Sequence, residues 1–129
     1  MFENTNITPP KLSTHDRVVN HIAQSFQGTY TVLSNIGTPK HYISSIFPDL
    51  IMQDKADNKT RFIIEVKENG GVALCIQAWK SQPSIPATLY IVVPKDLLSE
   101  AKKVAQIVGL SARFGSYTVT NDEIKVDFE

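Results

Sequence analysis

Residues 48–67, PDLIMQDKADNKTRFIIEVK, decide the fold. They contain two apolar runs, 49–53 and 61–67, separated by the turn-rich sequence KADNKT. Short apolar runs bounded by turn-forming residues are typical of β-strands. So close a connection favours an antiparallel pair, because parallel strands need a crossover of about a dozen residues or more. This stretch therefore predicts two adjacent antiparallel strands.

The sequence that follows predicts a crossover to a buried strand. Gly70-Gly71 breaks the chain, and a helix is expected over residues 72–81, where apolar side chains recur at helical spacing. Residues 88–93, TLYIVV, form a nearly continuous apolar run. Such a run is typical of a strand that is covered on both faces. The intervening helix permits a right-handed crossover to this central strand.

The flanking sequence completes an α/β domain. Before the strand pair, it predicts a helix over 14–27 with a Ser13–Asp16 capping box and a strand over 29–33. Thr38-Pro39 is expected to open one or two helical turns with Tyr42, Ile43, Ile46 and Phe47 on one face. After the buried strand, it predicts a helix capped by Asp96 and ended by Gly109, and then a strand over 112–119. Helices are expected on both faces of a mixed sheet.

Length and composition favour one small domain. The chain has 129 residues, 42% of them hydrophobic, and we expect a polar lead at 1–13, a domain at 14–120 and an acidic tail at 121–129. No apolar run approaches the roughly 18 residues that cross a bilayer, so no membrane partner is expected. The lone Cys75 leaves nothing for a disulfide framework, which suits a cytoplasmic location.

The charge balance neither supports nor excludes nucleic-acid binding. The chain carries 13 basic and 13 acidic residues, whereas proteins that bind nucleic acid usually have a basic surplus. Residues 121–129 carry four acids and one lysine, so residues 1–120 carry 12 basic and 9 acidic residues, a net of +3. A metal ion held by two acids would make the surface around those acids more positive.

Acidic and basic side chains are expected to meet at one end of the first strand pair. Side chains alternate along a strand, so Glu65 and Lys67 project from one face, about 7 Å apart. Asp49 begins the neighbouring strand and, in an antiparallel pair, lies near the end of its partner. Two carboxylates and a lysine then converge.

That grouping suits metal-assisted hydrolysis of phosphodiesters. The carboxylates of Asp49 and Glu65, with the backbone carbonyl of Val66, can hold Mg²⁺, or Mn²⁺ in its place, and leave positions for water and a phosphate oxygen. Lys67 can orient or deprotonate the attacking water, or stabilise charge in the transition state. The sequence leaves these roles of the lysine open.

Pro48-Asp49, then fifteen residues, then Glu65-Val66-Lys67 resembles the signature of the PD-(D/E)XK nuclease superfamily. That group contains many restriction endonucleases, archaeal Holliday-junction resolvases and RecB-type nuclease domains. The resemblance implies a restriction-endonuclease-like fold with an α-β-β-β-α-β core over residues 14–93, and an added helix and strand after it. It also implies that Asp49 and Glu65 are metal ligands and Lys67 the catalytic lysine of an endonuclease or exonuclease acting on DNA in preference to RNA.

The chain departs from the family pattern at two places. Many members carry a metal-site glutamate on the first helix, where only Asp16 could substitute here. RecB-like members carry Gln-x-x-x-Tyr after the core, whereas Gln77 is followed by no tyrosine at that spacing. Both departures bear on the subfamily more than on the core chemistry.

Weaker candidates for substrate contacts are Gln77 and Lys80, which are at least as well explained as ordinary surface residues, and His41, for which surface placement is the better explanation. Trp79 could stack on a base, but its spacing favours core packing. The three histidines, His15, His21 and His41, show no metal-ligand spacing.

Two alternatives to the enzyme stay open. One is a catalytically inactive nucleic-acid-binding or assembly module on the same fold, and the other is an α/β interaction domain without nucleic acid. A homodimer with both sites on one side is also expected, because one small domain has a shallow grip on a duplex.

Overall fold

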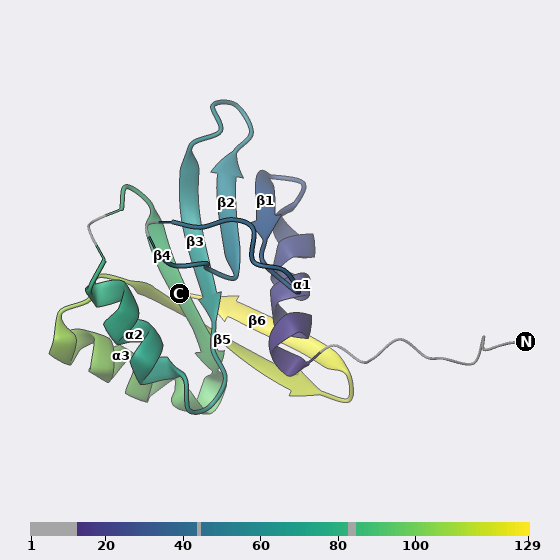
Figure 1. Ribbon diagram of the computed structural model, residues 1–129. Coiled ribbons are helices and arrows are strands. Elements are labelled where there is room, and N and C mark those ends of the chain that lie inside the picture. Colours follow the sequence, from purple (N-terminus) through teal and green to yellow (C-terminus); the bar gives the residue numbers. More distant parts are fainter. Residues whose placement is uncertain (1–12, 44, 83–84) are drawn as a thin grey trace, which may run out of the picture.

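The computed structural model describes residues 13–43, 45–82 and 85–129. Within these residues, a curled six-stranded mixed sheet is accompanied by three α-helices (Figure 1). The elements are α1 (Thr14–Phe26), β1 (Tyr30–Ser34), β2 (Leu50–Asp54), β3 (Thr60–Val66), α2 (Val72–Lys80), β4 (Thr88–Pro94), the 3₁₀ helix η2 (Lys95–Leu97), α3 (Leu98–Val108), β5 (Arg113–Thr120) and β6 (Glu123–Phe128).

The order of strands in the sheet follows their order in the chain. β1, β2 and β3 pair antiparallel, and Leu50 of β2 lies opposite Ile64 of β3. β3 and β4 pair in parallel and are connected in sequence through α2, and β4 and β5 pair in parallel and are connected through α3. β6 returns antiparallel to β5. The antiparallel pair and the crossover to β4 that the sequence predicts are both confirmed.

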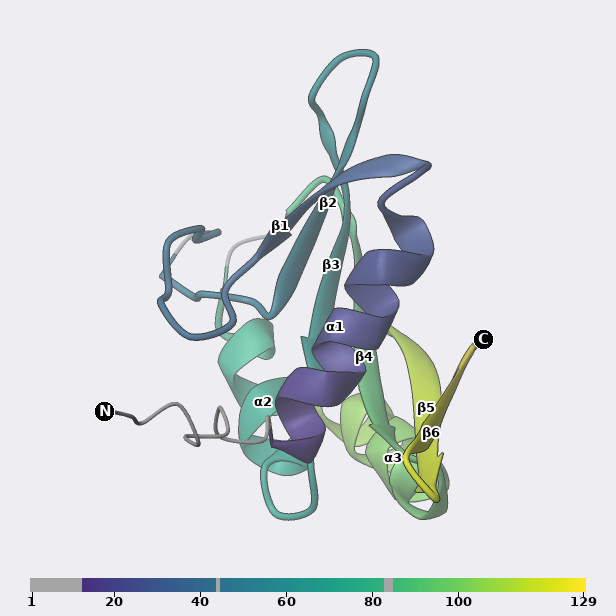
Figure 2. The ribbon, with the colours of Figure 1, turned by 90° about the vertical axis from the view of Figure 1, so that its right-hand side faces the viewer.

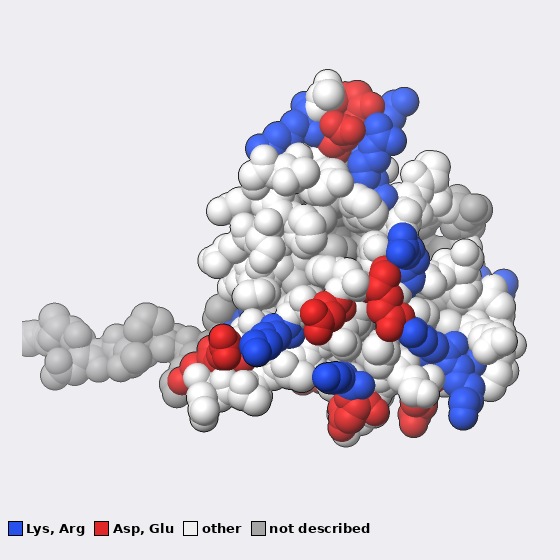
Figure 3. Space-filling model, turned by 180° about the vertical axis from the view of Figure 1, so that it is seen from behind, with Lys and Arg blue, Asp and Glu red and all other residues white. Residues whose placement is uncertain are grey.

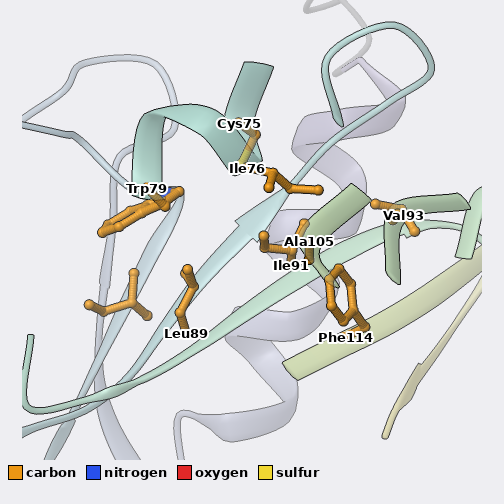
Figure 4. Close-up of a cluster of buried hydrophobic side chains, with 10 residues drawn as sticks. Cys75, Ile76, Trp79, Leu89, Ile91, Val93, Ala105 and Phe114 are labelled. Carbon is orange, nitrogen blue, oxygen red and sulfur yellow. The ribbon is translucent and has the colours of Figure 1, made fainter. Parts of the chain in front are cut away.

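Helices pack on both faces of the sheet, as the alternation of apolar side chains requires. One core cluster joins α1 to the face that bears Ile64 and Val66. The other joins α2 and α3 to the face that bears Ile63 and Ile91, and the close-up in Figure 4 shows Ile76 and Trp79 of α2 pointing into it. Fully burying a Val or Ile side chain stabilises the fold by roughly 1.5–3 kcal/mol, so each cluster is a major source of stability.

The first helix begins where its sequence predicts. Ser13 is the N-cap, and its hydroxyl accepts a hydrogen bond of 3.1 Å from the Asp16 N–H. Val18, Val19 and Ile22 are buried along the face that meets the sheet. The cap fixes where α1 starts, and the apolar face fixes which side turns inward.

The helical turns predicted after Thr38-Pro39 are not found in the part of this segment that the structure describes. The described residues of 38–47 contain an isolated bridge between Ile43 and Ile46 and no helix. The side chain of Asn35 explains the difference, because its Oδ1 accepts the backbone N–H groups of Lys40 and His41, both at 2.8 Å. These bonds tie the backbone into a loop and compete with helical pairing.

Two further predictions need correction near the C-terminus. Asp96 does not cap α3 but lies within η2, and the N-cap of α3 is Leu97, without a side-chain hydrogen bond. Most of the segment predicted as an acidic tail instead forms the edge strand β6, Glu123–Phe128. Asn121 and Asp122 both have positive φ, 48° and 66°, and this pair of residues closes a two-residue hairpin between β5 and β6. Among the described residues, no helix is long and apolar enough to cross a membrane.

Candidate active site

Asp49 and Glu65 lie together where β2 begins and β3 ends. The backbone N–H of Asp49 donates to Glu65 Oε1 at 3.0 Å, and the backbone N–H of Val66 donates to Asp49 Oδ2 at 2.7 Å. Each carboxylate is therefore held by the backbone of the other strand. These two bonds require the antiparallel register of β2 and β3, so the fold itself brings the two acids to one place.

Glu65 is a buried carboxylate with a defined partner. Its side chain projects toward α2, where the indole Nε1–H of Trp79 donates to Glu65 Oε2 at 2.9 Å. Burial raises the pKa of Glu65 and the negative charge of Asp49 raises it further, while the Trp79 hydrogen bond and the charge of Lys67 act in the opposite direction. Trp79 is itself buried in the α2–α3 core, which confirms core packing and adds a polar role that its spacing did not predict.

His15 is the site residue that the sequence did not reveal. Its Nε2 lies 3.0 Å from Asp49 Oδ1, and its Nδ1 lies 2.8 Å from Asp16 Oδ1. The hydrogen bond to Asp49 raises the pKa of His15 to about 9, with a smaller rise from Asp16 and an opposing effect of burial. The imidazole is therefore protonated at neutral pH and donates to both carboxylates. The nearest sequence signal was its place beside Asp16 in the first turn of α1.

Glu68 fixes α1 to this end of the sheet. The carboxylate follows β3 and accepts a hydrogen bond of 2.9 Å from the backbone N–H of His15. The first backbone N–H groups of a helix have no partner within the helix, and an acidic side chain there is favourable to the helix dipole. Glu68 thereby places the His15 ring over Asp49.

Each of the four carboxylate oxygens of Asp49 and Glu65 has one N–H donor. The donors are His15, the backbone of Val66, the backbone of Asp49 and the Trp79 indole. A carboxylate oxygen has two lone pairs, so each of them retains the capacity to bind one more proton or a cation. The described residues contain no group of three or more His, Cys, Asp or Glu side chains arranged to hold a metal. Two carboxylates alone would leave most positions of a bound cation to water or other oxygen ligands.

Lys67 is half-buried directly after β3. Its backbone N–H donates to the Val92 carbonyl at 2.9 Å, which extends the pairing with β4. Its charge favours the ionised forms of both Glu65 and Cys75. The side chain runs beside Gly71 at the start of α2, where a β-carbon would lie 3.8 Å from Lys67 Cδ. The positive charge of Lys67 is thus close enough to Glu65 to favour its ionised form.

The thiol of Cys75, which is close to Glu65, is not suited to act as a nucleophile. Cys75 of α2 is buried, and burial raises its pKa to about 12, with an additional rise from the charge of Glu65. A thiol with such a pKa stays protonated and is a weak nucleophile. Figure 4 shows its side chain in the core beside Ile76, as the sequence predicts for a small apolar residue.

The weaker candidates from the sequence have other surroundings. Gln77 is exposed on α2. Lys80 Nζ donates to the Gly109 carbonyl at 3.1 Å and so ties α2 to the end of α3. His41 is half-buried in the loop before β2, where its backbone N–H and carbonyl both bind the Asn35 side chain. No described contact joins these side chains to Asp49 or Glu65.

Charges are mixed on the surface seen in Figure 3, where Lys and Arg side chains alternate with Asp and Glu in the described part of that face. This face offers no basic stripe of the kind that follows a duplex backbone. Compared with protein-family models, with curated proteins and with solved structures, the chain gives no significant match.

Proposed function

We propose that the chain is a metal-dependent nuclease with a restriction-endonuclease-like fold, which hydrolyses phosphodiester bonds in DNA. One observation carries this proposal: Asp49 and Glu65 are locked side by side by reciprocal backbone hydrogen bonds, with Lys67 directly after the same strand. A pair of carboxylates can hold a divalent cation, and a neighbouring lysine can act on the attacking water or the transition state.

Electrostatics support a cation at this place. Glu65 is only 5% exposed and lies beside the Asp49 carboxylate, so two like charges share a poorly hydrated region. Like charges in such a region disfavour one another unless a positive charge compensates them. The carboxylates of Asp49 and Glu65, with the Val66 carbonyl, would hold Mg²⁺ or Mn²⁺. When bound, such an ion polarises the phosphate and lowers the pKa of water.

The chain's own residues then have distinct roles. Lys67 either takes a proton from the attacking water or stabilises negative charge on the phosphate oxygens. The water oxygen bonds to phosphorus, the bond to the leaving sugar oxygen breaks, and that oxygen gains a proton. His15 and the Val66 N–H hold the two oxygens of Asp49, so this carboxylate is oriented before substrate arrives. Preorganised groups of this kind need no rearrangement during the reaction.

His15 also supports a second candidate function, a catalytically inactive nucleic-acid-binding or assembly module. Its pKa of about 9 makes the ring a cation at neutral pH, already paired with Asp49. With Trp79 on Glu65, the two carboxylates have donors without any metal. A site that is satisfied in this way can persist for structural reasons alone.

A substrate panel separates the two functions. Labelled single-stranded, duplex, flapped and branched DNA, and single-stranded RNA, are incubated with the protein and Mg²⁺ or Mn²⁺. We expect cleavage of at least one DNA, and its loss in Asp49→Asn. The matched control is Asp57→Asn, an acid in the β2–β3 turn that makes a salt bridge to Arg61. A parent protein that binds no divalent cation and cuts none of these substrates would rule out the nuclease and favour the inactive module.

A further inference from the structure

Two aromatic rings stand exposed on the loop that leads into Asp49. Tyr42 is 66% exposed and Phe47 is 48% exposed, and their ring centroids lie 5.8 Å apart with the planes at 64°. Large apolar side chains that gather on a surface often mark a binding site, whereas isolated ones are ordinary. Here the two rings are in contact and form one patch, which we call the Tyr42–Phe47 patch.

The loop holds this patch in a defined place. The Asn35 side chain accepts the N–H groups of Lys40 and His41 and donates to the carbonyls of His41 and Pro48, both at 2.6 Å. Asn35 also donates its backbone N–H to the Asp49 carbonyl at 3.1 Å. One side chain thereby closes the loop and anchors its end next to the candidate active site.

The same loop turns its other apolar residues inward. Ile43 and Ile46 exchange backbone hydrogen bonds and pack against the α2–α3 core. The loop stands on the side of the sheet that carries α2 (Figure 2). Ile43 and Ile46 therefore attach the loop to the core, while the rings of Tyr42 and Phe47 lie on its outer side and are exposed to solvent.

The patch lies within reach of a phosphate at the site. Phe47 precedes Asp49 by two residues, so their Cα atoms are at most about 7 Å apart. A stacked strand rises about 3.4 Å per nucleotide, so this span corresponds to about two nucleotides. Lys40, exposed on the same loop, adds a positive charge for a phosphate.

We propose that the Tyr42–Phe47 patch stacks on unpaired bases, so that the substrate has single-stranded character within a few nucleotides of the bond that is cut. This inference rests on the proposed nuclease function and names its substrate class. Inside a duplex the faces of each base are covered by its neighbours, and an aromatic side chain stacks readily only on unstacked bases. Stacking also suits a chain of zero formal net charge, because it needs fewer phosphate contacts than duplex binding does.

Binding without cleavage tests the stacking directly. Fluorescein-labelled oligonucleotides of one sequence, as single-stranded DNA, single-stranded RNA and blunt duplex, are titrated in EDTA. For the parent we expect tighter binding of a single strand than of the duplex, and the two single strands show which sugar is preferred. The double substitution Tyr42→Ala with Phe47→Ala should weaken single-strand binding by roughly 5- to 150-fold, the loss of at least one stacked base.

Two control variants keep the test specific. Ile107→Ala removes an apolar side chain that is 77% exposed on α3, and its single-strand affinity should equal that of the parent. Tyr42→Trp keeps a ring at the patch and should retain the affinity. Circular dichroism and urea unfolding of each variant establish that it is folded before binding is measured.

The outcomes distinguish this inference from the proposed function. If the parent cuts DNA but the double variant binds single strands as well as the parent does, the stacking is wrong and the nuclease stands. If the parent binds single strands through these rings and cuts nothing, the stacking stands and the nuclease fails. A parent dimer that the double substitution dissociates, with no change in oligonucleotide binding, would make the patch a protein interface and overturn the inference.

Discussion

The β2–β3 pair carries a cluster of acidic and basic side chains at each end, and the two clusters differ in their access to water. In the turn, Arg61 lies 3.3 Å from both Asp54 and Asp57, and all three side chains are well exposed. At the other end, Asp49 and Glu65 are largely buried, and Asp49 contacts His15. The same strand pair thus carries one cluster of charged side chains that is exposed to water and one that is largely buried.

The consequence of this difference is visible in the ionisation of the acids. A backbone hydrogen bond from Ala56 and the nearby Arg61 lower the pKa of Asp54 in the turn. Burial and the charge of Asp49 raise the pKa of Glu65. Water screens the turn, so its ion pairs contribute little. Charges that are held together away from water are the ones that a divalent cation can stabilise strongly, and burial therefore distinguishes the candidate site.

The largest expected effect concerns cleavage and compares one lysine at each end of the strand pair. Lys67→Ala should reduce cleavage by about 10² or more, the scale of losing one positioned proton-transfer or electrostatic group. Lys55→Ala, in the turn, should cleave as the parent does. Single-turnover cleavage of a labelled substrate with Mg²⁺ measures both. Equal rates for Lys67→Ala and the parent would remove the lysine from the mechanism.

The next effect concerns stability. Trp79→Phe keeps the aromatic packing but removes the donor to Glu65 Oε2, and a buried charged acceptor without its partner costs about 1–3 kcal/mol. Arg61→Met, which breaks both ion pairs of the turn, should change stability far less. Urea unfolding gives both values. In Glu65→Gln the Trp79→Phe change should cost less, and equal costs in the two backgrounds would contradict the coupling.

Mg²⁺ should stabilise the folded protein through the end of the strand pair that carries Asp49, and not through the turn. Mg²⁺ at tenfold over its Kd stabilises a folded protein that alone binds it by about 1.4 kcal/mol. Asp49→Asn should lose most of this gain, whereas Asp57→Asn should keep it and Lys67→Ala should keep or increase it, because a neighbouring positive charge is removed. Thermal shift with and without Mg²⁺ measures the gain. An unchanged shift in Asp49→Asn would place the ion elsewhere.

The smallest effect is a pH dependence of opposite sign at the two ends, measured in EDTA. The pKa of His15 is raised from 6.5 to about 9, so its stabilising contribution is complete below pH 6.5 and is lost as the pH rises through 9. The pKa of Asp54 is lowered, so its contribution is present above pH 3.8 and is lost as the pH falls. His15→Asn should flatten the alkaline decline of the unfolding midpoint, while Asp54→Asn should leave that decline unchanged. An alkaline decline that persists in His15→Asn would show that another group titrates there.

The sequence predicted the parts of the structure that depend on neighbouring residues. Alternation along residues 61–67 was enough to place Glu65 on a strand with Lys67 directly after it, and the short KADNKT turn was enough to bring Asp49 beside Glu65. These inferences needed only strand geometry and a hairpin.

The features that were missed depend on contacts between distant or irregular segments. His15 reaches Asp49 across 34 positions of sequence, and the docking of α1, through its apolar face and through Glu68, creates that contact. Asn35 overrode the helical pattern after Pro39 by binding the backbone itself. The Asn121-Asp122 turn gave a local signal for a hairpin, but the acidic composition of the last nine residues favoured a tail.

Because every strand pairs with its neighbour along the chain, the sheet can assemble in sequence order. A hairpin forms in about 1–10 μs, so the β2–β3 pair can bring Asp49 and Glu65 together while both are still hydrated. Their repulsion becomes costly only later, when α2 packs and Trp79 covers Glu65. If Trp79 packs on Glu65 only after the folding transition state, a cation bound at the proposed site would relieve a cost that is absent from that transition state. Bound metal should therefore lower the unfolding rate and leave the folding rate nearly unchanged.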